Sequence, residues 1–167
     1  MPITGNVDDH TKQAFSDLPA LFGSRRKGGR VNFGDDIFAR IVVTHASVDN
    51  KAEEPLKQEG RVVCEIVVTE DMLNGGGNLH GGCSAYLIDN CSSLSLMIVQ
   101  PGPNVSQSLN IVYHSPATLG DKLRIVNTSI AIGARALSAR AEIWNVTKHR
   151  LVASGVHIKM QPSTAKL

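Results

Sequence analysis

The sequence contains one long, mostly apolar stretch, GCSAYLIDNCSSLSLMIV at residues 82–99. It is too long for an ordinary strand, because strands usually span about 3–10 residues. The run Pro101-Gly102-Pro103 follows and closes it, since a proline turn does not continue a helix. The stretch therefore predicts a long helix, and its composition predicts that the helix is buried.

Strands are predicted on both sides of this helix, because apolar and polar residues alternate there with a period of two. Two strands are expected before the helix and joined by the polar run 49–60, one with Ile37, Ala39, Ile41 and Val43, the other at 62–68. Four are expected after it, at 105–113, 123–130, 137–146 and 151–159. Their short connections favour antiparallel pairing. The predicted fold class is α+β, with one antiparallel sheet wrapped around a long central helix.

The first 35 residues are predicted to be an N-terminal extension, ahead of a main domain at 36–162 and a tail at 163–167. A short helix is expected at 11–22, capped by Asp8-Asp9 and interrupted by Pro19. The basic, glycine-rich run at 24–30 is interpreted as a solvated linker, with a nuclear signal or a phosphate clamp as alternatives.

Composition narrows the class of protein. The 167 residues carry 17 Lys+Arg against 15 Asp+Glu, and a net charge of +2 does not make nucleic acid or an anionic membrane the default partner. No apolar run approaches the ~20 residues of a spanning helix, and the N-terminus lacks a secretory signal pattern. The three cysteines are interpreted as reduced thiols. An intracellular protein without a membrane span is therefore expected, with Val, Ile, Leu and Ala building the core because only 4% of residues are aromatic.

Charge is almost absent from the middle of the chain. Between Asp71 and Asp121 the only Lys, Arg, Asp or Glu is Asp89, inside the apolar helix. An isolated carboxylate in a buried helix is costly unless it has partners or partial access to water, so Asp89 is a functional candidate. The alternative is that Asp89 bonds a neighbouring backbone group or faces solvent.

The entrance to the helix is rich in glycine, from Asn74 to Gly82. Unpaired N–H groups and the positive end of the helix dipole can polarise a carbonyl or hold an anion there, although a flexible turn is the simpler explanation. Gly81 and Asp89 are eight residues apart in sequence, which is about 12 Å along a helix. If they act on one carbonyl they belong to different chains, with two such helices antiparallel across a twofold axis.

Other chemistries fit the sequence less well. Ser84 lies in a run that misses the G-x-S-x-G pattern at its last position. His80 and Cys83 offer two zinc ligands, but Cys91 lies about 12 Å beyond Cys83 and does not complete the site. No Rossmann or Walker pattern occurs. No metal or separate cofactor is expected.

A set of spaced residues resembles the hotdog-fold acyl-CoA thioesterases, in the branch of phenylacetate-pathway thioesterases and acyl-CoA thioesterase 13. It comprises Asn74, His80-Gly81-Gly82, Asp89-Asn90 and the pattern running from Ser106 through Asn110 and Tyr113 to Asp121. The resemblance implies a central helix wrapped by a sheet, and edge-to-edge dimers, commonly as dimers of dimers. It also implies roles for five residues. The Gly81 N–H and the Asn74 side chain hold the thioester carbonyl, Asp89 of the facing protomer activates water or attacks directly, Ser106 orients that water, and His80 supports the loop.

The resemblance also implies where the substrate lies. Coenzyme A, as part of substrate and product, is expected along Ser108, Tyr113, His114, Ser115, Pro116, Ala117 and Thr118, with its phosphates at the turn Gly133, Ala134 and Arg135. Additional phosphate contacts are expected from His157, Lys159 or the basic run at 24–30. Leu87, Ile88, Leu94 and Met97 are candidates for the acyl pocket, although most are expected to be core.

These residues lead to one expected function and two alternatives. The expected activity is hydrolysis of a fatty or aryl acyl-CoA to free acid and CoA by a homodimer or homotetramer in fatty acid metabolism. One alternative is a non-catalytic acyl-CoA-binding subunit, and another is a hydratase, whose D-x-N-P-x-H pattern the sequence lacks. The expected compartment is the cytoplasm. Asp8-Asp9 argues against a mitochondrial presequence, so mitochondria, reached by another route, remain the alternative.

Overall fold

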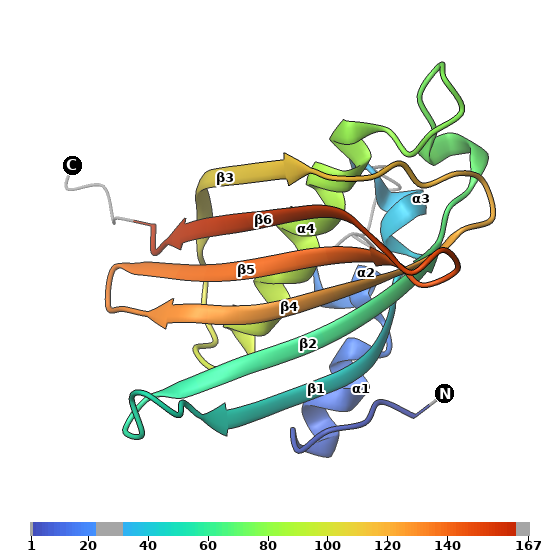
Figure 1. Cartoon of the computed structure of the whole chain (residues 1–167). Helices are drawn as coiled ribbons and strands as arrows, with labels where there is room; N and C mark the ends of the chain where they lie inside the picture. Colours follow the sequence, from blue (N-terminus) through green and yellow to red (C-terminus); the bar gives the residue numbers. More distant parts are fainter. Residues whose placement is uncertain (1, 23–31, 163–167) are drawn as a thin grey trace.

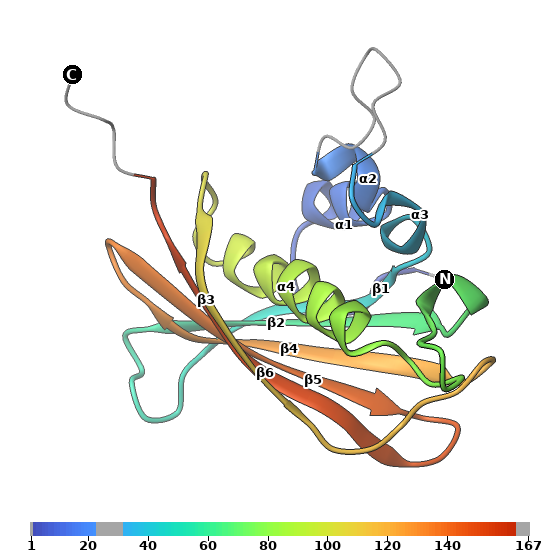
Figure 2. The same ribbon diagram turned by 90° about the horizontal axis from the view of Figure 1, so that it is seen from above.

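The helix α4 (Gly81–Met97) lies against a strongly curved antiparallel sheet in the computed structural model, which describes residues 2–22 and 32–162 (Figures 1 and 2). The predicted basic linker and tail lie outside these residues. The sheet has six strands in the order β1-β2-β4-β5-β6-β3, so β1 and β3 form its edges. The strands are β1 (Val42–Asn50), β2 (Gln58–Val67), β3 (Val105–Tyr113), β4 (Lys122–Ile132), β5 (Ala136–Asn145) and β6 (Arg150–Met160). This arrangement confirms the predicted α+β class.

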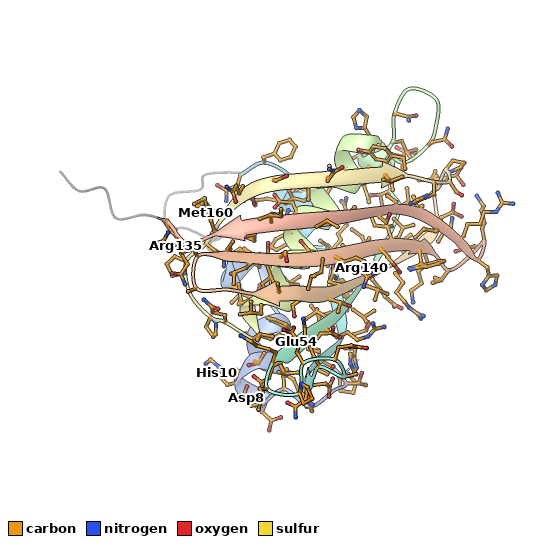
Figure 3. All side chains as sticks on the ribbon, turned by 60° about the vertical axis from the view of Figure 1, so that its left-hand side comes forward. Asp8, His10, Glu54, Arg135, Arg140 and Met160 are labelled. Carbon is orange, nitrogen blue, oxygen red and sulfur yellow. The ribbon has the colours of Figure 1, made fainter. Side chains whose placement is uncertain are left out.

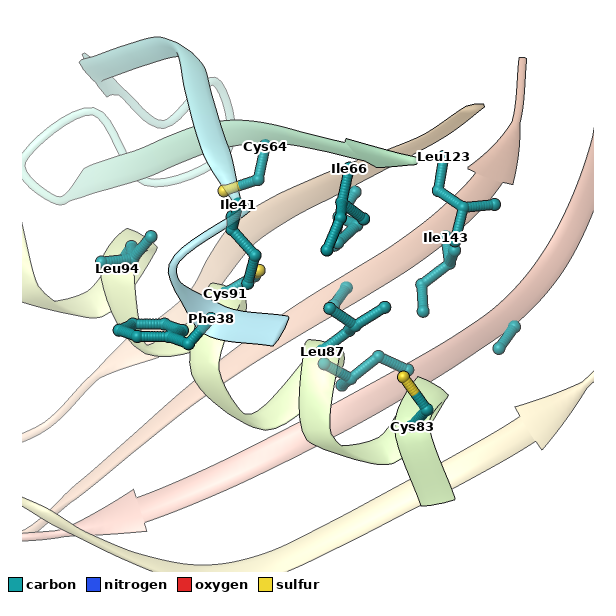
Figure 4. Close-up of a cluster of buried hydrophobic side chains, with 14 of the residues drawn as sticks. Phe38, Ile41, Cys64, Ile66, Cys83, Leu87, Cys91, Leu94, Leu123 and Ile143 are labelled. Atoms are coloured by element: carbon teal, nitrogen blue, oxygen red, sulfur yellow. The ribbon is translucent and has the colours of Figure 1, made fainter. Parts of the chain in front are cut away.

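Two glycines allow α4 to approach the sheet closely. A Cβ added to Gly60 of β2 would lie 2.2 Å from the Ser95 carbonyl oxygen, and one added to Gly155 of β6 would lie 3.2 Å from Ile88. The absence of side chains at these two points lets the backbone of the sheet contact the helix. The core fills the remaining space mainly with aliphatic and cysteine side chains, including Cys64, Leu87, Cys91, Leu94 and Ile143 (Figure 4).

The first strand begins later than its alternation predicts. Residues 35–38 form the short helix α3 (Asp35–Phe38), and β1 begins only at Val42. Gly34 starts α3 with a positive φ of 73°, and two aspartates follow in the first turn, where the helix dipole favours negative charge. The prediction of a strand from Ile37 was therefore wrong. The polar residues up to Asn50 extend β1 instead, because it is an edge strand bonded to β2 on one side.

The N-terminal residues form two short helices where one interrupted helix is predicted. Asp8 caps α1 (Asp9–Phe15) by accepting a hydrogen bond from the Thr11 N–H, and α2 (Leu18–Leu21) carries Pro19 in its first turn. These helices and α3 lie on the same side of the sheet as α4 (Figure 2). Phe15 and Leu18 are buried in the main hydrophobic cluster, so the first residues contribute to the same core.

No helix within residues 2–22 and 32–162 is long and apolar enough to cross a membrane.

Candidate active site

Asp89 lies at the centre of a polar cluster between α4, β3 and β6. Its Oδ1 accepts a hydrogen bond from Ser106 Oγ at 3.0 Å and lies 3.2 Å from His157 Nε2. His157 Nε2 is also 2.9 Å from Ser106 Oγ, and its Nδ1 is 2.8 Å from Ser92 Oγ. The Asp89 side chain is 42% exposed and lines a cavity, so its carboxylate is oriented by partners while remaining open to a ligand.

His157 is neutral in this cluster. Burial lowers its pKa to about 4, the nearby Lys159 cation acts in the same direction, and the Asp89 carboxylate opposes both. Because Ser106 Oγ donates to Asp89, the Nε2 atom of His157 carries the ring hydrogen and Nδ1 accepts from Ser92. A neutral ring contacts the Asp89 carboxylate as a hydrogen-bond donor, so this contact orients the Oδ1 atom without forming an ion pair.

The pH dependence of stability should report this neutral histidine. Its folded-state pKa of about 4 lies below the ordinary 6.5, so the unfolded state binds the extra proton as the pH falls from 6.5 towards 4. Between pH 7 and pH 5 we expect the free energy of unfolding to fall by about 2 kcal/mol more in the wild type than in His157→Gln. Chemical denaturation at both pH values measures this difference. Equal slopes for wild type and His157→Gln would show that the ring is not held neutral.

The start of α4 presents an unused backbone donor. His80 is the N-cap of α4, and its Nδ1 accepts a hydrogen bond from the Gly82 N–H at 2.9 Å. No acceptor among the described residues takes the Gly81 N–H. The Gly81 carbonyl oxygen accepts from the Tyr113 hydroxyl at 3.1 Å. The capping therefore leaves the Gly81 N–H, at the positive end of the helix dipole, able to bind a carbonyl oxygen.

Asn74 organises the loop that leads into α4. Its side-chain oxygen accepts hydrogen bonds from the Gly76 N–H at 2.9 Å and the Asn78 N–H at 3.2 Å. These two bonds fix the carboxamide, and no hydrogen bond from its NH₂ group is formed within the part of the chain that the structure describes. The exposed NH₂ group is a second donor on the loop that leads to the Gly81 N–H.

The predicted coenzyme A residues fall into separate places. Tyr113, His114, Ser115, Pro116 and Ala117 border a cavity of about 350 Å³ next to Gly81. Thr118 follows in a turn that the buried Asp121 holds in place. Burial alone would raise the pKa of this carboxyl, but hydrogen bonds from Thr118, Lys148 and Asn145 outweigh it and lower the pKa to about 2.

The turn of Gly133, Ala134 and Arg135 joins β4 to β5 at the opposite end of the sheet, where β6 ends at Met160 (Figure 3). It does not meet the Tyr113–Thr118 segment within one chain. Ser108 lies in a third place, in a cavity on the sheet that it shares with Arg140 of β5 and Ser154 of β6.

His157 and Lys159 occupy a different place from the one expected for phosphate contacts. Both lie on the inner face of β6, where His157 is 0% exposed and the Lys159 Nζ donates to Ser93 Oγ at 2.9 Å. Burial lowers the pKa of Lys159, and the Asp89 carboxylate opposes this shift. The signal for this position was the two-residue period of β6, because Ala153, His157 and Lys159 share one buried face.

The acyl-pocket candidates on α4 are mostly core. Leu87, Ile88 and Leu94 are fully buried against the sheet, which leaves them no free surface for a substrate. The open cavities beside Asp89 lie on the outer side of α4 instead.

No group of three or more His, Cys, Asp or Glu side chains is placed to hold a metal within the described ranges. Burial raises the pKa of Cys83 to about 11, so its thiol is protonated at neutral pH and is a poor metal ligand.

Comparison with known proteins identifies the family. A family model described as the thioesterase superfamily matches residues 76–152. Acyl-coenzyme A thioesterase 13 of Homo sapiens is 38% identical over 101 residues, which cover 60% of this chain and 72% of that protein. The chain belongs to the thioesterase superfamily.

Solved structures of this superfamily share the fold. Thioesterase superfamily member 2 of Mus musculus has a TM-score of 0.68 and 28% identity, over 92% of this chain and 98% of that one. A hypothetical thioesterase protein of Streptococcus pneumoniae, solved with coenzyme A, has a TM-score of 0.57 and 26% identity, over 62% of this chain and 80% of that one. The hotdog fold expected from the sequence is confirmed.

In this thioesterase, the sequence did not predict two of the side chains that form the polar cluster around Asp89. Ser92 and His157 were not connected with Asp89, although Ser92 lies three residues along α4 and therefore near the same face. The aromatic residues beside Asp89 were missed as well, because Phe22, Phe33 and Phe38 come from a region outside the family pattern.

Proposed function

We propose that this thioesterase hydrolyses acyl-CoA thioesters to free acid and CoA, in a site that two protomers build together. Asp89 of one protomer activates water, Ser106 orients that water, and the Gly81 N–H and Asn74 NH₂ of the partner hold the thioester carbonyl. The observation that carries the proposal is the setting of Asp89. One of its oxygens is fixed by Ser106 and His157, while the side chain remains open to a cavity.

The chemistry follows from these groups. The water oxygen attacks the carbonyl carbon while Asp89 accepts its proton, and the two donors stabilise the negative oxygen of the tetrahedral intermediate. The carbon–sulfur bond then breaks, and the departing thiolate takes up the proton. One water and one thioester thus give one acid and one thiol, and no step needs a metal or a redox cofactor.

The spacing within one chain supports a shared site. Gly81 and Asp89 are eight positions apart along α4, which is about 12 Å. Two copies of α4, antiparallel across a twofold axis, bring the start of one helix beside Asp89 of the other. The same operation brings the Tyr113–Thr118 segment of one chain towards the Gly133 turn of its partner, so that both can contact one CoA molecule.

The surface of β3 supports the same assembly. Among the described residues this strand is an edge of the sheet that pairs with β6 alone, and it carries the exposed apolar side chains Val105, Val112 and Tyr113. An unprotected edge with apolar side chains readily pairs with another strand. A second β3 across the twofold axis would form hydrogen bonds with the free backbone groups of this edge and would make one continuous sheet through a homodimer. Two such homodimers can associate as a dimer of dimers.

The relatives support the substrate class. The human relative is named an acyl-coenzyme A thioesterase, and the streptococcal structure holds coenzyme A. The decisive experiment is thiol release from a panel of acyl-CoAs by the purified protein, followed with a thiol reagent. Release from at least one substrate supports the proposal. Binding of acyl-CoA without any release would assign the non-catalytic binding role instead.

A further inference from the structure

A cavity of about 650 Å³ separates the outer side of α4 from the described residues that precede β1, at 2–22 and 32–41, which we call the N-terminal segment. From α4 its lining includes Ala85, Tyr86 and Asp89, which recur at the three- and four-residue spacing of one helix face. From the N-terminal segment it includes Phe22, Phe33 and Phe38. Its size falls in the range of small-molecule sites, about 300–1,000 Å³.

The concentration of aromatic rings here is unusual for this chain. The whole sequence has four Phe, two Tyr and one Trp, and four of these rings line this one cavity. Phe22 packs edge-to-face on Phe38 with ring centroids 5.1 Å apart, and Phe33 packs on Tyr86 in the same manner at 5.5 Å. Phe33 is nevertheless 87% exposed, so most of its ring is free to contact a further group.

Tyr86 ties the N-terminal segment to α4. Its hydroxyl donates to the Gly34 carbonyl oxygen at 3.1 Å. Gly34 has a φ of 73°, and a Cβ added there would lie 2.5 Å from Tyr86 Cζ. The position therefore requires glycine for two separate reasons, its backbone conformation and the close approach of the ring. The contact holds Phe33 at the edge of the cavity that contains Asp89.

The position of Asp89 identifies the occupant. A thioester whose carbonyl carbon lies beside Asp89 must place its acyl group in a neighbouring cavity, and the buried residues of α4 leave no room on the sheet side. Among the described residues, two cavities adjoin Asp89. The smaller one, about 340 Å³, is lined by polar groups that include Ser106 and Lys159, so an apolar acyl group fits the larger aromatic one better. Asp35 adds a second carboxylate to the lining, held by the Asn32 N–H at 2.7 Å. Two carboxylates beside aromatic rings favour an uncharged acyl group and disfavour one with a terminal carboxylate.

We propose that the aromatic cavity formed by Phe22, Phe33, Phe38 and Tyr86 is the acyl pocket and selects bulky, uncharged apolar acyl groups. The proposal rests on the proposed thioesterase function and assigns the selectivity of that site to the N-terminal segment. Phe33 is the determinant that contacts the acyl group at the edge of the pocket. Asp35 is the determinant that rejects acyl groups with a terminal carboxylate.

The first test compares kcat/KM for decanoyl-CoA and 3-phenylpropanoyl-CoA with kcat/KM for acetyl-CoA. In Phe33→Ala we expect both ratios to fall about tenfold, because a bulky acyl group loses an aromatic contact that acetyl does not use. A fall in only one ratio shows whether alkyl or aryl groups use this ring, and still supports the pocket. Leu56→Ala is the control. It removes an exposed apolar side chain that does not line the cavity, and it should leave both ratios unchanged. Unchanged ratios in Phe33→Ala, with thiol still released, would overturn the proposal but not the thioesterase function.

The second test uses a matched pair of substrates, hexanoyl-CoA and adipoyl-CoA, which differ by a terminal carboxylate. The wild type should prefer hexanoyl-CoA, and Asp35→Asn should narrow that preference about tenfold. An Asp35→Asn protein with the wild-type preference would contradict the assigned role of Asp35.

Sedimentation and thermal melting separate the pocket from its structural alternatives. Phe33→Ala should keep the wild-type oligomeric state and melting temperature. A dissociated Phe33→Ala protein would show that Phe33 is covered by a second copy instead, and would overturn the proposal. Gly34→Ala should displace Tyr86 and lower the two bulky-acyl ratios as well, and wild-type ratios in that variant would count against the pocket.

Discussion

Replacing Asp89 by Asn is expected to lower kcat for thioester hydrolysis by about 10³-fold. The amide retains the shape of the carboxylate and its contact with Ser106, but it does not accept a proton from water. General-base catalysis typically contributes about 10²–10⁴-fold, so its loss should dominate the rate while KM changes little. Thiol release under saturating substrate measures the effect.

The matched control for this variant is Asp36→Asn. Asp36 is an exposed carboxylate in the first turn of α3 and does not line the cavity of Asp89. It should retain wild-type kcat. An Asp89→Asn protein with activity close to that of Asp36→Asn would remove Asp89 from the reaction.

Replacing Gly81 by Pro is expected to lower kcat by about 10²–10³-fold, the usual cost of losing one donor to a developing oxyanion. Gly81 is the first residue of α4, where proline is well tolerated because its missing N–H has no partner within the helix. His80 is already extended, with φ −64° and ψ 134°, which suits a residue before proline. The substitution therefore removes the N–H with little change to the backbone.

Gly81→Ala provides the control, because it keeps the N–H. An added Cβ would lie 3.4 Å from the Tyr113 ring, an ordinary contact. We expect Gly81→Ala to stay within a few-fold of wild type under the same assay. Equal losses in the Pro and Ala variants would mean that space at this position, rather than the N–H, limits the reaction.

The sequence predicts the parts of the fold whose patterns are local. The long apolar run predicts α4 to within a few residues at each end. The two-residue period predicts β2 to β6, because burial of one face of a strand directly imposes that period. The predicted start of β1 was wrong. Ile37 and Ile41 are four residues apart, and this spacing fits one face of a helix as well as one face of a strand. The division into an extension at 1–35 and a main domain stays a prediction, although Phe15 joins the main core.

The candidate site was predictable only in part, for a physical reason. Asp89 stood out because an isolated charge in an apolar helix is costly, and Gly81 because a glycine-rich loop precedes a helix. The contact of His157 with Asp89 depends on how α4 crosses β6, which no local pattern encodes. The same holds for Phe33, whose approach to Tyr86 depends on the fold of a segment distant in sequence.

The central claim is that each active site combines Asp89 of one chain with Gly81 of another. The most direct measurement is the activity of heterodimers purified with two different tags, one chain carrying Asp89→Asn and the other Gly81→Pro. Each homodimer should be inactive, but every heterodimer should contain one intact site and one doubly altered site. We expect these heterodimers to recover about half of the wild-type kcat per dimer. Heterodimers as inactive as the two parents would show that the site lies within one chain and would contradict the account.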